Sequence, residues 1–418
     1  MKNRIQFFSI TAFFSLFICY ASWAKHLDLS SSIKQVLDTH PAIAAAHASY
    51  YAEKVRITPL YFPENPKIGL MSENNMQSWS VSQELSIPMK YYYRGLAQEQ
   101  LALSMQEELT IKKLQLRKEV IMAYYELFQR EKSLELLQGQ RDLLKQIARI
   151  AESRRTVGQV SIQDEMRAHL EQAKLENDIL MAEQDKIAAL AKLEEILGTE
   201  NKATTNEQEL AALKLETPKI TIQADQLKSI AHSLSSVDIP SLKAESFKIT
   251  EALAQKTIAK TNYWPDFELS YQKSLEKDND NKKVAIEFKI PLWFFAKESN
   301  EVSAASEKII GAQKKSELVK RELQSRLSSL AAKILAKENI LKLYETTLIP
   351  QGISTTNSAQ SAYKAGRVGF FELLDSERTV YNLRISFYQE LKEYTEAISE
   401  FESNLGRSIS SLPFEGVL

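Results

Sequence analysis

Two stretches of the chain alternate between apolar and polar residues and then run into Ile-Pro and a cluster of aromatics. The first is 79–93 (WSVSQELSIPMKYYY) and the second is 283–295 (KVAIEFKIPLWFF). The apolar positions are Val81, Leu85 and Ile87 in the first and Val284, Ile286, Phe288 and Ile290 in the second. Alternation with a period of two residues predicts β-strands that have one apolar and one wet face. The proline predicts the end of each strand, because it cannot donate to the hydrogen-bond ladder.

A second alternating stretch lies upstream of each of these, at 67–73 and 265–272. The pairs predict two β-hairpins, 67–87 and 265–290. Their strands approach the roughly nine to eleven residues that a tilted membrane-spanning strand needs. Aromatics suited to a membrane girdle stand at one end of the strands: Tyr61, Phe62, Tyr91, Tyr92, Tyr93, Tyr263, Trp264, Trp293, Phe294 and Phe295. Half-buried hairpins of a soluble protein are the alternative, but the same placement in both hairpins favours the membrane.

The rest of the chain predicts long helices, since glycine and proline number only 11 each in 418 residues. A helix is expected over 30–57, and residues 95–154 form a second, uninterrupted pattern. Apolar residues then recur at heptad-like steps: Val120, Tyr124, Leu127, Leu134, Leu137, Leu144 and Ile147, followed after a short break by Met166, Leu170, Ala173, Leu180 and Ile187. Such seams are typical of coiled-coil packing. At about 1.5 Å per residue, a helix over 95–154 is a rod of about 90 Å.

The second half of the chain repeats this order of elements. A helix over 223–262 precedes the second hairpin, and a rod over 298–364 follows it, with a local kink predicted at Pro350 and Gly352. The seams are Leu323, Leu327, Leu330, Ile334, Leu341, Tyr344 and Leu348 on the rod, and Leu373, Val380, Phe387, Leu391, Tyr394, Ile398, Phe401 and Leu405 on the last helix. Gly158 and Gly198 are 40 residues apart, as are Gly366 and Gly406, which indicates an internal two-fold repeat.

The N-terminus has the pattern of a secretory signal peptide, 1–24. Lys2 and Arg4 precede an uncharged apolar run over 7–20, and Ala24 offers a cleavage site. The single cysteine, Cys19, follows Ile18, a poor fit to a lipoprotein signal, so cleavage after Ala24 is favoured over lipidation. The mature chain then has neither a disulfide nor a thiol nucleophile. It keeps 51 basic and 54 acidic residues, and this balance gives no reason to expect a nucleic-acid partner.

The predicted fold class is mainly α with a small β part. The division is a first repeat over 25–198, a polar linker over 199–222, a second repeat over 223–406 and a C-terminal tail over 407–418. Four strands cannot close a barrel, and open sheet edges are not tolerated in lipid. Rods with exposed apolar seams also need neighbours, so an oligomer is expected. Two copies would supply eight strands and three would supply twelve.

The order of elements from residue 27 to 406 resembles the TolC-like outer-membrane efflux proteins. The PENP turn at 63–66, the two Ile-Pro strand exits, the tips VGQVS and AGRVG and the two Leu-Gly helix ends also match. The PENP turn is more similar to the branch associated with heavy-metal exporters. The resemblance implies a homotrimer whose strands form a β-barrel in the outer-membrane lipid and whose helices form a barrel in the periplasm. It also implies a periplasmic adaptor protein and an inner-membrane pump of the RND type as partners.

The resemblance also assigns residues. The family's constriction matches Glu372 and Asp375, which share one helix face and in three copies would give two carboxylate rings, favourable to cations. Without the resemblance, acidic residues near a helix start simply favour the helix dipole. The tips match the adaptor-docking end: Val157, Gly158, Gln159, Val160, Gly366, Arg367, Val368 and Gly369.

Other chemistry is weakly supported by the sequence. His40 and His47 are seven residues apart and are expected on one helix face, but no cysteine or third ligand accompanies them, so neither a metal site nor a cofactor is expected. No phosphate loop or hydrolase motif occurs, and the chain is not expected to be an enzyme. Three functions stay open: an efflux channel, the outer-membrane channel of a type I protein secretion system, and a non-channel periplasmic coiled-coil scaffold. Detergent dependence separates the channels from the scaffold, and the exported substrate is left open.

Overall fold

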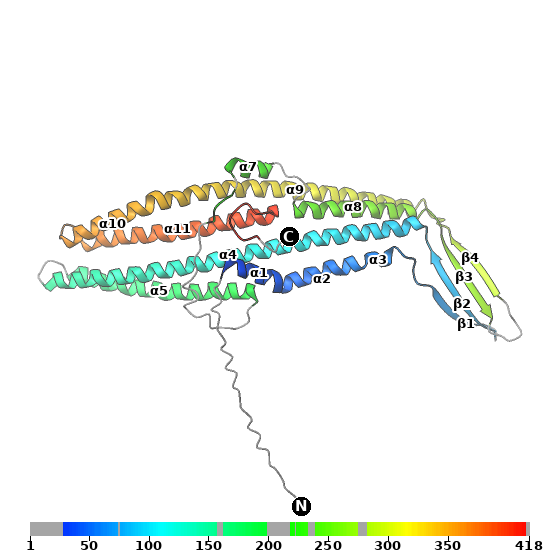
Figure 1. The fold of residues 1–418 in the computed structure, drawn as a ribbon, viewed down its shortest axis with the longest axis horizontal. Helices are drawn as coiled ribbons and strands as arrows, with labels where there is room; N and C mark the ends of the chain where they lie inside the picture. The colour runs from blue at the N-terminus through cyan, green and yellow to red at the C-terminus, as the bar shows by residue number, and fades with distance from the viewer. Residues whose placement is uncertain are drawn as a thin grey trace, which may run out of the picture.

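The computed structural model describes residues 28–73, 76–156, 162–198, 218–221, 223–232, 239–274 and 282–414. The predicted signal peptide, the first tip (Val157, Gly158, Gln159 and Val160) and most of the predicted linker lie outside these residues. The described part is mainly helical, with one small sheet at the end of a long helical body (Figure 1). The expected mixture of long helices and a small β part is confirmed.

The elements repeat the order that the sequence predicts. They are α1 (Leu29–Thr39), α2 (Pro41–Val55), α3 (Ile57–Leu60), β1 (Lys67–Glu73), β2 (Met76–Leu85), α4 (Pro88–Thr156), α5 (Ile162–Leu197), α7 (Ala224–His232), α8 (Pro240–Thr261), β3 (Asp266–Ser274), β4 (Lys282–Lys289), α9 (Glu298–Leu343), the π-helical turn η1 (Tyr344–Leu348), α10 (Ile349–Lys364) and α11 (Phe370–Leu405). Helices, a hairpin, a long helix and a returning helix thus occur twice.

Prolines divide two of the predicted helices. The expected helix over 30–57 is broken before Pro41, where His40 is extended at φ −70° and ψ 127°. The expected helix over 223–262 is likewise interrupted, since α8 begins at Pro240. Both single-helix predictions are wrong at these points, because proline lacks the N–H of the helix interior and fits best in the first turn. A π-helical turn over Tyr344–Leu348 lies just before Pro350, and the kink predicted at Pro350 and Gly352 stays a prediction.

The two predicted hairpins are both present, and they join into one antiparallel sheet in the order β1-β2-β3-β4. The join is between β2 and β3, one from each repeat, with Val81 opposite Tyr271 and Leu85 opposite Phe267. Both strands of each repeat run into helices at the same end of the sheet (Figure 1). The sheet therefore extends the helical body instead of packing across it.

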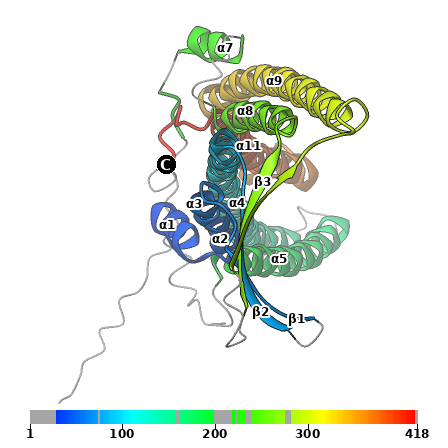
Figure 2. The same ribbon diagram turned by 90° about the vertical axis from the view of Figure 1, so that its right-hand side faces the viewer.

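The helices form one curved layer with α4 at its centre. On the sheet side of the body α4 packs against α2 and α8, and α8 packs against α9; on the far side α4 packs against α5 and α11, and α11 packs against α10. The outer helices are therefore α2 and α5 along one edge and α9 and α10 along the other (Figures 1 and 2). Within the described residues, no helix is both long and apolar enough to cross a membrane.

Two hydrophobic cores hold this layer together. One surrounds the middle of α4 and includes Val120, Leu127, Leu327 and Phe401; the other lies near the tips of α4, α5, α10 and α11. The seam predicted on α4 and most of the seams predicted on α9 and α11 are buried in these cores, while Phe387 of α11 packs partly buried against the first core. The seam predicted on α5 behaves differently: Met166, Leu170, Leu180 and Ile187 are 54–69% exposed. Leu175 and Ile179 pack in their place, so α5 carries two apolar stripes and uses only one within the chain.

Candidate functional site

The sheet has one apolar face. Paired residues of neighbouring antiparallel strands project to the same side. The register therefore places Ile68, Val81, Tyr271 and Val284 in one row across the sheet, and Leu85, Phe267 and Phe288 in another. Large side chains on this face remain open in the single chain: Ile68, Leu70, Leu269, Val284, Ile286 and Phe288 are 44–82% exposed. Soluble monomers rarely leave so continuous an apolar patch uncovered.

The other face of the sheet is polar, as the alternation predicts. Small side chains line much of it: Gly69, Ser78, Ser80, Ser82, Ser270 and Ala285. Nearer the helices, Glu84, Glu268 and Glu287 stand side by side on three strands. Lys289 Nζ lies 2.6 Å from Glu84 Oε1 and offsets part of this charge. The two faces therefore differ as the two sides of a membrane-spanning barrel wall do.

Both edges of the sheet are open. β1 and β4 pair with only one neighbour each among the described residues. Unpaired N–H and C=O groups along such edges join other strands readily and cannot face lipid. Among the described residues, the apolar face and both edges of the sheet are therefore left uncovered.

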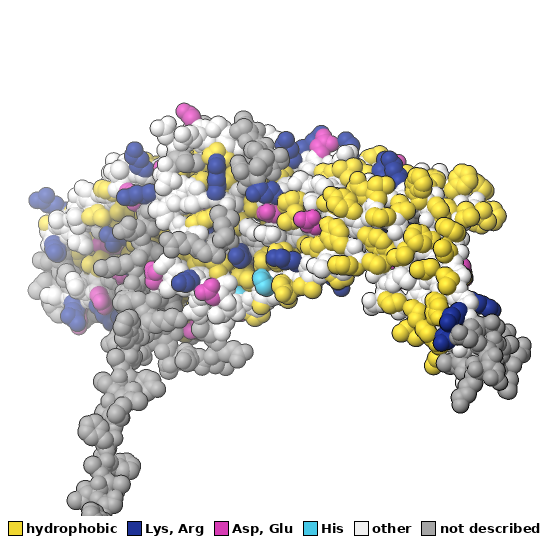
Figure 3. Space-filling model, turned by 45° about the vertical axis from the view of Figure 1, so that its right-hand side comes forward, with side chains coloured by type: hydrophobic (Ala, Val, Ile, Leu, Met, Phe, Trp, Pro, Cys, Tyr) yellow, Lys and Arg dark blue, Asp and Glu magenta, His cyan; other side chains and the backbone are white. Residues whose placement is uncertain are grey.

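The predicted girdle aromatics lie where strands and helices meet. Phe62, Trp264, Trp293, Phe294 and Phe295 are 52–68% exposed, and Tyr92 is 55% exposed. Tyr61 and Tyr263 are nearer 40%. Apolar side chains gather at this end of the helical body, while charged ones are spread over the rest of the visible face (Figure 3).

Two of these aromatics also have local partners. The backbone N–H of Ser86, just after β2, donates to the Tyr91 hydroxyl at 2.8 Å and so has a hydrogen-bond partner beyond the end of the strand. The Tyr61 ring lies against Gly95 of α4, so closely that a Cβ on Gly95 would stand 2.2 Å from a ring carbon. These two tyrosines therefore also fix how the strands leave the helices.

Glu372 and Asp375 lie on an exposed face of α11, one turn apart. Their orientation follows from Leu373 and Leu374, which are buried in the tip core. Glu372 is in the first turn of α11, and its Oε2 is 2.7 Å from the place of a Cβ on Gly369. A carboxylate so near the N-terminus also favours the helix dipole, so one chain by itself supports both interpretations.

Phe371 is a residue of this face that the sequence pattern missed. It is 61% exposed, whereas its neighbour Phe370 is 3% exposed. It lies one turn before Asp375 on the same helix. The sequence could have indicated it, since Phe371 is a large apolar residue outside the seam that begins at Leu373.

The second tip is a tight turn between α10 and α11. Gly366 has φ 72°, a left-handed conformation that favours glycine, and its N–H donates to the Tyr363 carbonyl. Gly366, Arg367 and Gly369 are exposed, and Val368 packs partly against the tip core. Gly198 and Gly406, which end α5 and α11, are also left-handed at φ 66° and 78°. Equivalent glycines thus close both repeats.

Comparison with known proteins agrees with this geometry. No protein-family model matches the sequence. The cobalt-zinc-cadmium resistance protein CzcC of Cupriavidus metallidurans is 21% identical over 389 residues, 92% of this chain and 87% of CzcC. The outer-membrane channel OprN superimposes with a TM-score of 0.75 at 15% identity, covering 90% of this chain and 89% of OprN. The outer membrane protein VceC of Vibrio cholerae gives 0.74 at 13% identity, covering 93% and 98%.

The chain has the fold of the TolC-like outer-membrane channels. Within this fold, an ion pair between Arg378 of α11 and Glu171 of α5 joins the second repeat to the first. Beside it lies a cavity of about 260 Å³ that Leu137, Asp178 and Tyr381 help to line. Burial, together with the nearby Asp178 charge, raises the pKa of Tyr381 to about 12. No sequence pattern predicts this contact, because Arg378 and Glu171 are 207 residues apart.

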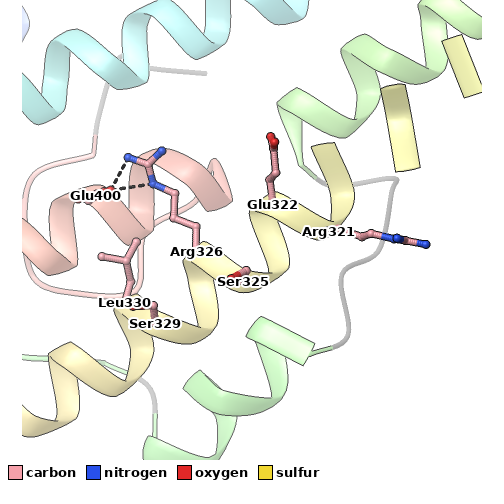
Figure 4. Close-up of a pocket in the computed structure, with 7 residues that line it drawn as sticks. All are labelled: Arg321, Glu322, Ser325, Arg326, Ser329, Leu330 and Glu400. Atoms are coloured by element: carbon pink, nitrogen blue, oxygen red, sulfur yellow. Dashed lines mark hydrogen bonds and ion pairs between the residues drawn. The ribbon is translucent and has the colours of Figure 1, made fainter. Parts of the chain in front are cut away.

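Larger hollows on the described part of the chain are open grooves. One of about 570 Å³ runs beside α9 and the end of α11, where Arg326 reaches across to Glu400 with its Nε 2.8 Å from the carboxylate (Figure 4). Within the described ranges, no three His, Cys, Asp or Glu residues converge to hold a metal ion. The expectation that His40 and His47 share a helix face is wrong. The His40 Nδ1 accepts the Ala42 N–H and caps α2 from outside, whereas His47 stacks on Tyr51.

Proposed function

We propose that the chain is one subunit of a homotrimeric outer-membrane channel of an efflux system, with its helical part in the periplasm. The observation that carries this proposal is the single sheet with an exposed apolar face, a polar face and two open edges. If β4 of one copy pairs with β1 of the next, the contact is head-to-tail, and such contacts form a ring when the rotation closes. Three copies give twelve strands, the number that the TolC-like resemblance implies.

The helical edges fit the same arrangement. α5 presents the bulky stripe Met166, Leu170, Leu180 and Ile187 on one edge of the layer. On the other edge, α10 borders a groove of about 780 Å³ whose lining includes Ser354, Asn357, Ser358, Ser361 and Ala362. Large side chains pack into a surface of small ones as knobs into holes. We therefore place α5 of one copy against α10 of the next.

Glu372 and Asp375 form the periplasmic constriction in this proposal. In a ring of three copies their exposed carboxylates line a narrow passage and favour cations. CzcC is described as a cobalt-zinc-cadmium resistance protein, which supports divalent metal cations as the substrate class. The partners are a periplasmic adaptor at the tips, including Gly366 and Arg367, and an inner-membrane pump of the RND type.

Light scattering of the mature protein in mild detergent tests the assembly. We expect a trimer from the outer-membrane fraction and conductance when it is added to a planar lipid bilayer. Leu180→Glu puts a charge into the proposed contact between copies and should shift the protein to monomers, whereas Leu180→Met keeps an apolar side chain and should leave the trimer intact. A detergent-free soluble monomer would favour the scaffold and overturn the proposal.

A further inference from the structure

A buried ion pair joins the middle of α4 to the end of α11. Arg117 and Glu402 are both 0% exposed, and Arg117 Nη2 lies 2.8 Å from Glu402 Oε2. Burial lowers the pKa of Arg117, although the charge and hydrogen bond of Glu402 oppose this shift. Removing one partner from such a pair leaves an uncompensated charge in the core and is strongly destabilising. The packing of α4 on α11 therefore depends on how completely these two groups are satisfied.

Most of that satisfaction comes from the C-terminal strap, which we define as residues 408–414. Four donors of the strap converge on Glu402 Oε1, at 2.7 to 3.3 Å: the hydroxyls of Ser408 and Ser410 and the backbone N–H groups of Ile409 and Ser410. Arg117 Nε donates to the Pro413 carbonyl at 2.7 Å, and the guanidinium lies 4.5 Å from the centre of the Phe414 ring. Without the strap, Arg117 and Glu402 would keep few hydrogen-bond partners in the protein besides each other.

The strap also binds the segment between the two repeats. The Thr221 N–H donates to the Ile409 carbonyl at 2.9 Å, and the Ser411 N–H donates to the Lys219 carbonyl at 3.0 Å. The strap thus touches the first repeat at Arg117, the second at Glu402 and the connection between them. The strap therefore links both repeats and their connection at the centre of the molecule.

We infer that the strap is a folding checkpoint: α4 and α11 reach their final packing only when residues 408–414 cover the Arg117–Glu402 pair. In a chain that lacks the strap, packing α4 on α11 withdraws both charges from water without giving them the donors and the carbonyl that the strap supplies. Such a chain stays out of the folded form that can join other copies.

Truncation combined with removal of the charges tests this inference. A chain ending at Phe414 should fold like the full-length chain. A chain ending at Arg407 should lose at least about tenfold in its trypsin-resistant fraction after detergent extraction. Arg117→Met together with Glu402→Leu removes both charges, and apolar replacement of a whole buried pair is often tolerated. In the chain ending at Arg407, this double substitution should restore most of the resistant fraction.

Several outcomes would overturn the checkpoint. If the double substitution does not restore the shortened chain, the strap acts through its apolar residues, such as Ile409 and Leu412. Normal folding of the chain ending at Arg407, or failure of the chain ending at Phe414, also contradicts it. If the full-length double variant itself fails to fold, the single variants decide. Arg117→Met should then be tolerated better than Glu402→Leu, since the four strap donors still satisfy Glu402. Because the experiment measures folding and not conduction, its result does not depend on whether the proposed channel function is correct.

Discussion

Gly95 allows the segment before β1 to pack closely against α4. It lies in α4 beneath the Tyr61 ring, where an added Cβ would stand 2.2 to 2.5 Å from three ring carbons. The Tyr61 ring is 39% exposed and lies edge-on to Tyr92, so it must shift away from α4 to admit a methyl group. The close approach explains a glycine inside α4, near its start, where glycine is otherwise unfavourable.

Gly95→Ala should therefore destabilise the protein by about 1–3 kcal/mol, the usual cost of overpacking. Gly139→Ala is the matched control, because Gly139 lies in the same helix with nothing within 4 Å of its Cβ position. That control should be neutral or stabilise by up to about 1 kcal/mol through helix propensity. Urea unfolding in detergent measures both. Tyr61→Ala in the Gly95→Ala background should remove the clash, and equal effects of the two glycine variants would contradict this packing.

The strand faces give a prediction at the scale of the element. Ile286 is 58% exposed and lies opposite Leu269, while Glu287 is on the polar face opposite Glu268. Ile286→Arg puts a charge into lipid and should cost about 2–4 kcal/mol near the midplane and less near the interfaces. Glu287→Arg should be tolerated, because it faces water and relieves repulsion from Glu268. The amount of folded protein in outer-membrane fractions compares them; equal losses would mean that the faces are misassigned.

Periodicity correctly predicted the buried face of those helices whose apolar seam packs against other helices of the same chain. The seams on α4 and α11 are of this kind, and Leu127 and Ile398 are both 0% exposed. The stripe on α5 was identified as a seam, but no sequence pattern says whether its partner is in the same chain. The break before Pro41 was missed although the proline marks it, since proline fits the first turn of a new helix. Periodicity also gave no sign of Arg117 and Glu402, since charged residues count as surface until the fold pairs them.

At the scale of the whole molecule, the candidate gate depends on symmetry that one chain does not contain. Leu373 and Leu374 hold α11 so that Glu372 and Asp375 are exposed. In a trimer, the carboxylates of three copies would repel one another in a narrow lumen, and a bound cation would relieve that repulsion. The resemblance identifies Glu372 and Asp375, and the fold shows that both are exposed. Whether the carboxylates of three copies meet in a narrow lumen is tested by removing them.

Glu372→Ala combined with Asp375→Ala should keep α11 intact, since alanine favours the helix, but remove the charge from the pore. Single-channel recordings should then show weaker preference for cations and loss of block by divalent cations. Glu377→Gln is the matched control: it removes an acidic group two residues farther along α11, half-buried and hydrogen-bonded to Gln360, where burial raises the carboxyl pKa. That variant should conduct like the wild type. If the double variant also keeps its selectivity and divalent block, Glu372 and Asp375 serve only the helix start, and the channel closes elsewhere.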